Sequence, residues 1–154
     1  MNLTIARESP VGPDLTELFA RHSADMHADT PPESIHMMDA SQLNEAGAQF
    51  FVLRDAGASI AMGAFKPFEG THAEIKSMHV LSECRGKGLS RLMLNRIMDE
   101  AKAAGMTRLS LETGSQDLFL PARVLYERAG FTICPPFGDY VLDPMSVFMT
   151  RTLA

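Results

Sequence analysis

The sequence predicts an α/β fold in which a mixed β-sheet carries helices on both faces. Short apolar runs bounded by turn residues such as Gly, Pro and Asp indicate strands. Longer segments with apolar residues at a helical period indicate amphipathic helices that pack against a sheet. These segments follow one another in the order βααβββαβαββ. This order is typical of a mixed sheet covered on both sides.

The first part of the chain predicts one strand and two helices. Leu3–Arg7 has the pattern of a short strand, and residues 13 to 25 that of a helix. The apolar face of this helix holds Leu15, Leu18 and Phe19. Residues 30–34 contain two prolines and separate it from a short helix over residues 41–45, for which Ser41 is the predicted N-cap.

The middle of the chain predicts three strands. Residues 50–54 and 59–65 form two apolar runs, and Asp55-Ala56-Gly57 between them is a hairpin turn signal. Residues 73–80 form the next strand.

The last part predicts two helices and three strands. The first helix has an apolar face and ends at Gly105. The residues of that face are Leu89, Met93, Ile97, Ala101 and Ala104. A strand over residues 107–113 and a helix over residues 122–129 follow, the latter closed by Gly130. Residues 131–133 and 146–150 are the final strands, and a structured loop at residues 135–140 lies between them.

Length and composition exclude several classes of protein. The 154 residues fit one domain, spanning residues 1–154. The net charge of -5 argues against broad nucleic-acid binding, which needs many basic contacts. Cys84 and Cys134 lack metal-ligand spacing and fit a reduced, cytoplasmic compartment. We expect no signal peptide, and no apolar run approaches the roughly 20 residues of a membrane helix.

A glycine-containing loop lies between a predicted strand and the long amphipathic helix. It consists of Arg85, Gly86, Lys87, Gly88, Leu89 and Ser90. Glycines let the backbone approach a ligand closely, and the free N–H groups and dipole at a helix start attract anions. Arg85 and Lys87 add positive charge. The loop therefore predicts a site for a phosphate or pyrophosphate.

The loop differs from the common nucleotide-binding motifs. A nucleoside-triphosphate loop has Ser or Thr after its lysine, whereas Gly88 follows Lys87. A dinucleotide fingerprint has a third glycine, whereas Arg91 occupies that position. The G-x-S-x-G serine-hydrolase and H-E-x-x-H zinc-protease signatures are absent. These differences exclude the triphosphate loop and weaken the dinucleotide interpretation.

Two segments together resemble the GCN5-related N-acetyltransferase (GNAT) family. Arg85-x-x-Gly88-x-Ser90 is similar to its R/Q-x-x-G-x-G/A signature, and residues 122–131 are similar to its A-x-x-L-Y-x-x-x-G-F segment. A predicted helix and strand separate the two, as in the family, and the resemblance covers nearly the whole chain. Residues 32–34, 74–78, 111–114 and 136–140 also resemble bacterial acetyltransferases of the indole-acetate type.

The resemblance implies a GNAT-type acyl-CoA N-acyltransferase fold, whose central mixed, mostly antiparallel sheet is flanked by helices, and acetyl-CoA (coenzyme A) as the donor. The implied cofactor-binding residues are Met78, His79, Val80, Arg85, Gly86, Lys87, Gly88, Leu89, Ser90, Arg91 and Tyr126. For Arg91, an exposed helix position is the alternative. Two positions depart from the family: Ser90 replaces Gly or Ala, and Phe119 stands where many members have an Asn that contacts the cofactor.

Acetyl transfer to an amine requires a base, an N–H donor for the thioester oxyanion and an acid for the leaving thiolate. Glu74 is the predicted base, and the alternative is a solvated carboxylate or one paired with Lys76. The resemblance implies a backbone N–H near Met78 or His79 as the oxyanion donor. It implies Tyr126 as the acid, and the alternative is a tyrosine packed against the sheet.

Strand alternation predicts which side chains of residues 73–80 share a face. Glu74, Lys76, Met78 and Val80 are expected on one face of the sheet. Ala73, Ile75 and Ser77 are expected on the other, more core-like face.

The predicted acceptor-binding residues lie in four regions of the sequence. They are Glu33, Ser34, His36, Glu74, Glu112, Phe137 and Tyr140. Residues 33–36 follow the first helix, in a region that borders the acceptor cleft in the family. Glu112 orients an amine or guanidinium, or bonds nearby amides instead. Phe137 and Tyr140 wall the pocket, or anchor their loop by burial. No metal is predicted.

The sequence therefore predicts an N-acetyltransferase that moves the acetyl group of acetyl-CoA to the amine of a small molecule by direct attack on the thioester. One alternative is a peptide or protein acceptor. Another is a non-catalytic acyl-CoA-binding regulatory module, which would need neither Glu74 nor Tyr126. We expect no nucleic-acid or membrane partner. Many members of the family are dimers and the final strands offer an edge for pairing, which leaves a homodimer open.

Overall fold

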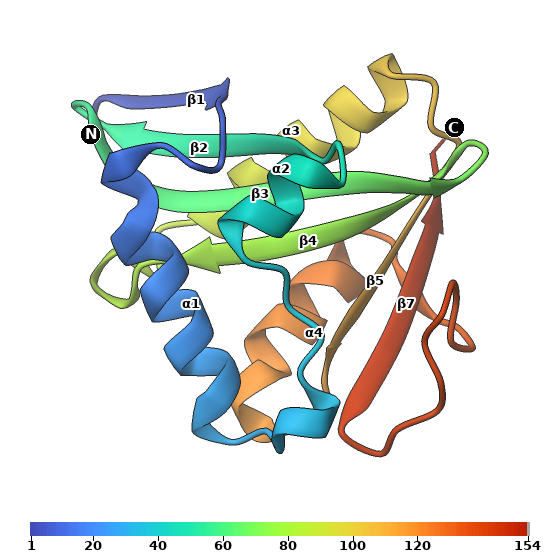
Figure 1. Ribbon diagram of the computed structural model, residues 1–154. Helices are drawn as coiled ribbons and strands as arrows, with labels where there is room; N and C mark the ends of the chain where they lie inside the picture. Colours follow the sequence, from blue (N-terminus) through green and yellow to red (C-terminus); the bar gives the residue numbers. More distant parts are fainter. Residues whose placement is uncertain (154) are drawn as a thin grey trace.

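The structure, a computed structural model, describes residues 1–153 and contains a seven-stranded sheet in the order β1-β2-β3-β4-β5-β7-β6 (Figure 1). The strands are β1 (Leu3–Arg7), β2 (Gln49–Asp55), β3 (Ala58–Glu69), β4 (His72–Val80), β5 (Arg108–Gly114), β6 (Thr132–Ile133) and β7 (Ser146–Thr152). All neighbouring strands are antiparallel except β4 and β5. The predicted mixed, mostly antiparallel sheet is confirmed.

Helices cover both faces of this sheet, as predicted. They are α1 (Thr16–Ala28), α2 (Ala40–Glu45), α3 (Leu89–Ala103) and α4 (Leu120–Arg128). In Figure 1, α1 and α2 lie in front of the sheet and α3 lies behind it. The Arg151 guanidinium of β7 contacts the sulfur of Met98 in α3 and the carbonyl oxygen of Ala129, directly after α4. The end of α4 therefore lies on the same face as α3.

The core lies between the sheet and the helices. Leu15 and Leu18 are buried at the beginning of the first helical segment, which confirms its predicted apolar face. On α3, the predicted face residues from Leu89 to Ala101 are buried, whereas Ala104 lies beyond the end of the helix and is exposed. Gly105 follows with a φ of 88°, as expected of a residue that ends a helix.

Several element ends differ from the prediction for local reasons. Residues 13–15 form a 3-10 turn, and α1 continues to Ala28. Asp39 rather than Ser41 caps α2, because its carboxylate accepts a hydrogen bond from the Gln42 N–H at 2.8 Å and the Gln42 side chain accepts one from the Asp39 N–H at 2.9 Å. α4 begins at Leu120, where Pro121 fits the first turn.

Strand β3 is longer than predicted and contains Pro67. The pairing of β3 with β2 ends at Phe65, so beyond that residue β3 has a strand neighbour only on the β4 side. A proline lacks the N–H that a central strand needs but is tolerated where one side is unpaired.

The feature that positions the site is the divergence of β4 and β5. These parallel strands pair only from His72 with Arg108 to Glu74 with Ser110. Beyond that point they separate, as Figure 1 shows. The edge of β4 from Ile75 to Val80 therefore has no strand partner on the β5 side. Backbone N–H and C=O groups along such an edge are available to a ligand.

Candidate functional site

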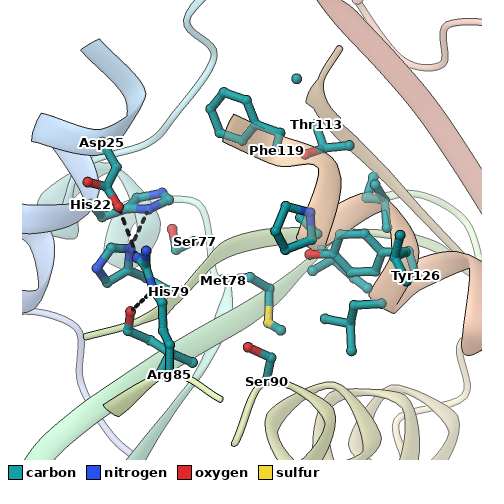
Figure 2. Close-up of a pocket in the computed structure, with 18 of the residues that line it drawn as sticks. His22, Asp25, Ser77, Met78, His79, Arg85, Ser90, Thr113, Phe119 and Tyr126 are labelled. Atoms are coloured by element: carbon teal, nitrogen blue, oxygen red, sulfur yellow. Dashed lines mark hydrogen bonds and ion pairs between the residues drawn. The ribbon is translucent and has the colours of Figure 1, made fainter. Parts of the chain in front are cut away.

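A cleft of about 800 Å³ opens where β4 and β5 diverge. β4 lines it from Glu74 to Val80, and β5 lines it from Leu111 to Gly114. Helix α1, the beginning of α3 and helix α4 supply the remaining walls. In Figure 2, Tyr126 stands on one side, His22 and Arg85 stand on the other, and Met78 lies between them.

The glycine loop enters α3 without a capping side chain. Gly86 and Gly88 have φ values of 82° and 76°, a conformation that favours glycine. Gly88 is the N-cap residue, and no side chain bonds the first N–H groups of the helix. A Cβ at either glycine would meet no atom within 4 Å. Free N–H groups, the positive end of the helix dipole and open space fit the pyrophosphate of coenzyme A.

The other predicted loop residues divide into two groups. Leu89, Ser90 and Arg91 line the cleft, whereas Lys87 is exposed and does not. The Arg85 side chain lines it too but is bonded within the protein. Its Nε donates to the Val80 carbonyl at 2.9 Å, and its guanidinium pairs with Asp25 of α1 at 3.0 Å. Arg85 thus ties the end of β4 to α1, and backbone amides of the loop remain for an anion.

Strand β4 carries a bulge beside the cleft. Where β3 has only Gly63, β4 has two residues, Ser77 and Met78. Ser77 has a φ of 59°, which is uncommon outside glycine. A bulge disrupts the regular ladder and redirects the backbone groups around it. The predicted oxyanion donor, an N–H near Met78 or His79, belongs to this irregular part of the strand.

The bulge overturns the predicted alternation along β4. The Lys76 ammonium reaches the His36 carbonyl and the Tyr140 hydroxyl, each at 2.9 Å. Met78 instead lies on the α3 face, where a Cβ on Gly63 would come within 2.7 Å of its sulfur. The expectation that Lys76 and Met78 share a face is wrong, because one extra residue in the strand reverses the side-chain phase.

Tyr126 of α4 forms a wall of the cleft. Its side chain is buried, and burial raises the pKa of its hydroxyl. The ring packs edge-on against Phe131, with centroids 5.7 Å apart. In Figure 2 the hydroxyl points from the ring toward the side of the cleft where Met78 lies. Tyr126 is therefore a packed tyrosine whose protonated hydroxyl borders the cleft.

Phe119 lies on the same side of the cleft, near Thr113 in Figure 2. Its ring packs against the backbone of Gly114, where any Cβ would collide with it. The Phe119 ring thus requires a glycine at the end of β5.

Two buried histidines join α1 to β4. The Nδ1 atoms of His22 and His79 lie 3.4 Å apart, and the rings meet edge to face. Both side chains are at least nine-tenths buried, and burial lowers the pKa of each to about 4. The pair is therefore uncharged at neutral pH and forms a polar contact between helix α1 and strand β4.

A cluster of polar groups surrounds Glu74, at the end of the cleft where β4 and β5 begin to diverge. The Glu74 carboxylate is buried, accepts a hydrogen bond from the Tyr140 hydroxyl, and lies 3.3 Å from the Lys76 ammonium. Burial, together with the Glu74 charge, raises the pKa of Tyr140. The ion pair with Lys76 that we considered for Glu74 is confirmed, and its role as the base stays a prediction.

Glu112 lies next to this cluster, on β5. It is half-buried, lines the cleft and has Phe148 of β7 as its cross-strand neighbour. Burial raises the pKa of Glu112 to about 7. The Ser146 hydroxyl and the Lys76 charge oppose this rise, whereas the Glu74 and Asp143 charges add to it. Glu112 is thus a carboxyl group that changes charge near neutral pH.

The remaining predicted acceptor residues lie around the cleft rather than all on its surface. His36 lines it. Glu33 is exposed and does not line it, and the buried Ser34 hydroxyl donates to Asp143 at 2.5 Å. Phe137 packs against Tyr140 and Phe148 with centroids 5.2 Å and 5.9 Å away, so it supports the cluster from outside the cleft.

Some cleft residues were not predicted from the sequence. They are His22, Asp25, Met26, Met37, Ser77, Thr113 and Leu118. His22 follows Leu15 and Leu18 at a helical spacing, which is a signal that would have placed it on the buried face. Met37 and Leu118 lie in irregular segments, where no period identifies a cleft residue.

Within residues 1–153, no helix is both long and apolar enough to cross a membrane. The same residues include no group of three or more His, Cys, Asp or Glu side chains arranged to hold a metal ion.

Comparison with known proteins identifies clear relatives. The family described as acetyltransferase (GNAT) matches residues 14–131. An uncharacterized N-acetyltransferase of Bacillus subtilis, YsnE, is 41% identical over 142 residues, which cover 92% of this chain and 94% of the relative. A protein of Azospirillum brasilense named IAA acetyltransferase is 39% identical in an alignment of 157 positions, gaps included, that covers 99% of each chain.

Solved structures share the fold. The PaiA N-acetyltransferase of Thermoplasma acidophilum, solved in complex with coenzyme A, has a TM-score of 0.77 and 15% sequence identity. The match covers 99% of each chain. At this identity the likeness concerns the fold alone.

Proposed function

Since this chain belongs to the acetyltransferase (GNAT) family and is an acetyl-CoA-dependent acetyltransferase, we propose that its acceptor is the amine of a small molecule. The observation that carries the proposal is the unpaired edge of β4 inside the cleft, with the free N-terminus of α3 at one end and the carboxylates Glu74 and Glu112 beside it.

The residues present fit acetyl-CoA. The backbone N–H groups after Gly88 are suited to the pyrophosphate, and the unpaired edge from Ile75 to Val80 is suited to an extended amide-containing arm. When bound, acetyl-CoA supplies an activated acetyl thioester. The N–H groups at the bulge provide the donors that stabilise negative charge on a carbonyl oxygen.

Two side chains are assigned to proton transfer. Glu74 takes a proton from the acceptor amine, because a protonated amine has no lone pair for attack. Tyr126 donates a proton to the departing thiolate, and its raised pKa keeps the hydroxyl protonated until then. Tyr140 and Lys76 orient the Glu74 carboxylate through the contacts described above.

The proposal is tested by combining binding and turnover. Calorimetry measures acetyl-CoA binding, and thiol release with a panel of small primary amines measures transfer. We expect binding together with amine-dependent thiol release above the hydrolysis rate. Release that depends only on peptides would indicate the alternative acceptor class. Binding without release for any acceptor would indicate a non-catalytic module.

We also propose a cytoplasmic location for the protein. Cys84 and Cys134 are free thiols, which fit a reducing compartment.

A second proposal is that the protein forms a homodimer. Strand β6 is at the edge of the sheet with Ile133 78% exposed, a feature that supports pairing with another copy. Light scattering of the purified protein tests the second proposal, and a monomer at all concentrations would contradict it.

A further inference from the structure

The acceptor side of the cleft has an excess of negative charge. The Glu112 carboxyl group interacts electrostatically with two other carboxylates, those of Glu74 and Asp143, and with one ammonium, that of Lys76. Lys76 is engaged by Glu74, at 3.3 Å. Asp143 is satisfied by the Ser34 hydroxyl and the Met145 N–H. Glu112 forms no ion pair with any basic side chain within residues 1–153.

The surroundings of Glu112 explain why this lack of a partner matters. Phe148 lies beside it on β7 and packs against Tyr140, with ring centroids 5.5 Å apart. The Ser146 hydroxyl favours the charged form of Glu112, but apolar rings stabilise a charge poorly, so a carboxylate with no cation beside it is unfavourable here. A ligand cation would stabilise it strongly, because the site is partly shielded from water.

We propose that Glu112 is the residue that selects the acceptor, by pairing with its positive charge. This inference rests on the proposed function. It specifies the acceptor as a molecule that arrives as a cation, and it separates recognition, at Glu112, from proton removal, at Glu74. An anionic acceptor would bring a like charge next to the Glu74 and Glu112 carboxylates, which line the cleft.

Other residues of the cleft indicate that the uncharged part of this cation is apolar. Met26 and Met37 line the cleft near α1, and Leu118 and Phe119 line it before α4. Leu118 is 47% exposed, which leaves apolar surface for a ligand to cover. The acceptor class is therefore an amphipathic amine, with a cationic head for Glu112 and an apolar body for these side chains.

A probe with a fixed charge isolates this interaction from the acceptor's own titration. 2-Phenylethylguanidinium stays charged across the useful pH range, and 2-phenylethylurea is a neutral molecule of nearly the same shape. We expect calorimetry to show tighter binding of the guanidinium than of the urea. Because the pKa of Glu112 is about 7, affinity for the guanidinium rises about tenfold between pH 6 and pH 8. Affinity for the urea stays flat.

Variants assign the pH dependence to one side chain. Glu112→Gln should remove both the preference for the cation and the rise with pH, whereas Glu112→Asp should retain part of each. Glu45→Gln, an exposed position on α2, is the matched control and should behave as the original protein. The other titratable groups near Glu112, which are Glu74, Lys76, Tyr140 and Asp143, remain in every variant.

The inference is overturned if Glu112→Gln binds the guanidinium with unchanged affinity and pH dependence, or if the urea binds as tightly as the guanidinium. Indole-3-acetate supplies the opposite charge, and its tighter binding would also contradict the inference. If these tests fail while amines still support thiol release, only the role of Glu112 is wrong. If the guanidinium binds through Glu112 but no amine supports release, the proposed function is wrong.

Discussion

Tyr126 combines a buried ring with a hydroxyl at the wall of the cleft, and this combination yields the first prediction. Tyr126→Phe keeps the ring, its packing on Phe131 and hence the fold. Because a general acid typically contributes about a hundredfold or more, turnover should fall by about that factor. Steady-state thiol release measures turnover, and calorimetry should show acetyl-CoA affinity nearly unchanged. Unchanged turnover in the variant would show that Tyr126 is not the general acid and contributes packing only.

Glu74 gives the second prediction. Glu74→Gln keeps the side-chain shape but removes the proton acceptor, so turnover at neutral pH should fall by about a hundredfold. The deficit should shrink as the pH approaches that at which the amine loses its own proton. A pH profile of kcat for both proteins makes the comparison. A rate equal to that of the original protein at every pH would exclude Glu74 as the base.

At the residue scale the sequence located side chains of the cleft but did not predict how they contact one another. Glu74 and Glu112 were named from their strand positions and both line the cleft. The contact of Tyr140 with Glu74 joins segments 66 residues apart, and no local pattern encodes such a pair. The bulge at Ser77 was missed because strand alternation carries no mark of an inserted residue.

The N-terminus of α3 gives the prediction that belongs to the scale of single elements. Gly88 precedes the helix and Gly105 follows it, with φ values of 76° and 88° and no atom within 4 Å of an added Cβ. Alanine at either position should cost about 1 kcal/mol of stability, because the left-handed conformation is strained for it. Gly88→Ala should also weaken coenzyme A binding roughly tenfold, since its Cβ enters the ligand's space.

Gly105→Ala serves as the matched control for that experiment. Thermal melting should give similar losses for the two variants, and calorimetry should show weaker binding for Gly88→Ala alone. Equal affinities in both variants would mean that the loop before α3 does not hold the ligand.

The elements themselves were largely predictable, and their ends were less so. The period of Leu89, Met93 and Ile97 identified α3 correctly, because packing on the sheet requires that spacing. Asp39 was missed as a cap, since Ser41 two residues later has the same chemistry and only the backbone geometry distinguishes them. β3 continues beyond Phe65 because those residues still pair with β4, which is a tertiary property.

The whole molecule should lose stability in mild acid through the pair of His22 and His79. Burial lowers the pKa of each to about 4, below the value of about 6.5 in an unfolded chain. The unfolded state therefore binds more protons between these values. The contribution of the pair is complete above pH 6.5 and is lost as the pH falls toward 4, by an amount on the order of 3 kcal/mol for each histidine.

Glu112 has the opposite effect over part of this range, since its pKa is raised and the folded state binds the proton first. The test is thus a comparison of variants by urea unfolding at pH 7 and pH 5. A double variant, His22→Gln with His79→Gln, should lose less stability on acidification than the original protein. The control His27→Gln, at an exposed position of α1, should follow the original protein. If the double variant and the control lost the same stability between pH 7 and pH 5, the histidine pair would not be the cause of the loss.

The overall architecture was predictable because element order and the glycine loop constrain it strongly. The divergence of β4 and β5 was not, although it creates the cleft. It depends on where a parallel pair stops bonding, and neither strand changes composition at Glu74 or Ser110. The cleft residues could therefore be predicted singly from the sequence, but their arrangement around one cleft depends on the whole fold.

In the function and acceptor class that we propose, this cleft transfers an acetyl group from acetyl-CoA to a small cationic amine. Mass spectrometry of the acceptor after incubation with acetyl-CoA and the protein tests it most directly. We expect an amine to gain one acetyl group on nitrogen, in step with thiol release, and the product to be sharply reduced in Tyr126→Phe. Acetyl-CoA bound by the protein with every amine recovered unmodified would contradict it.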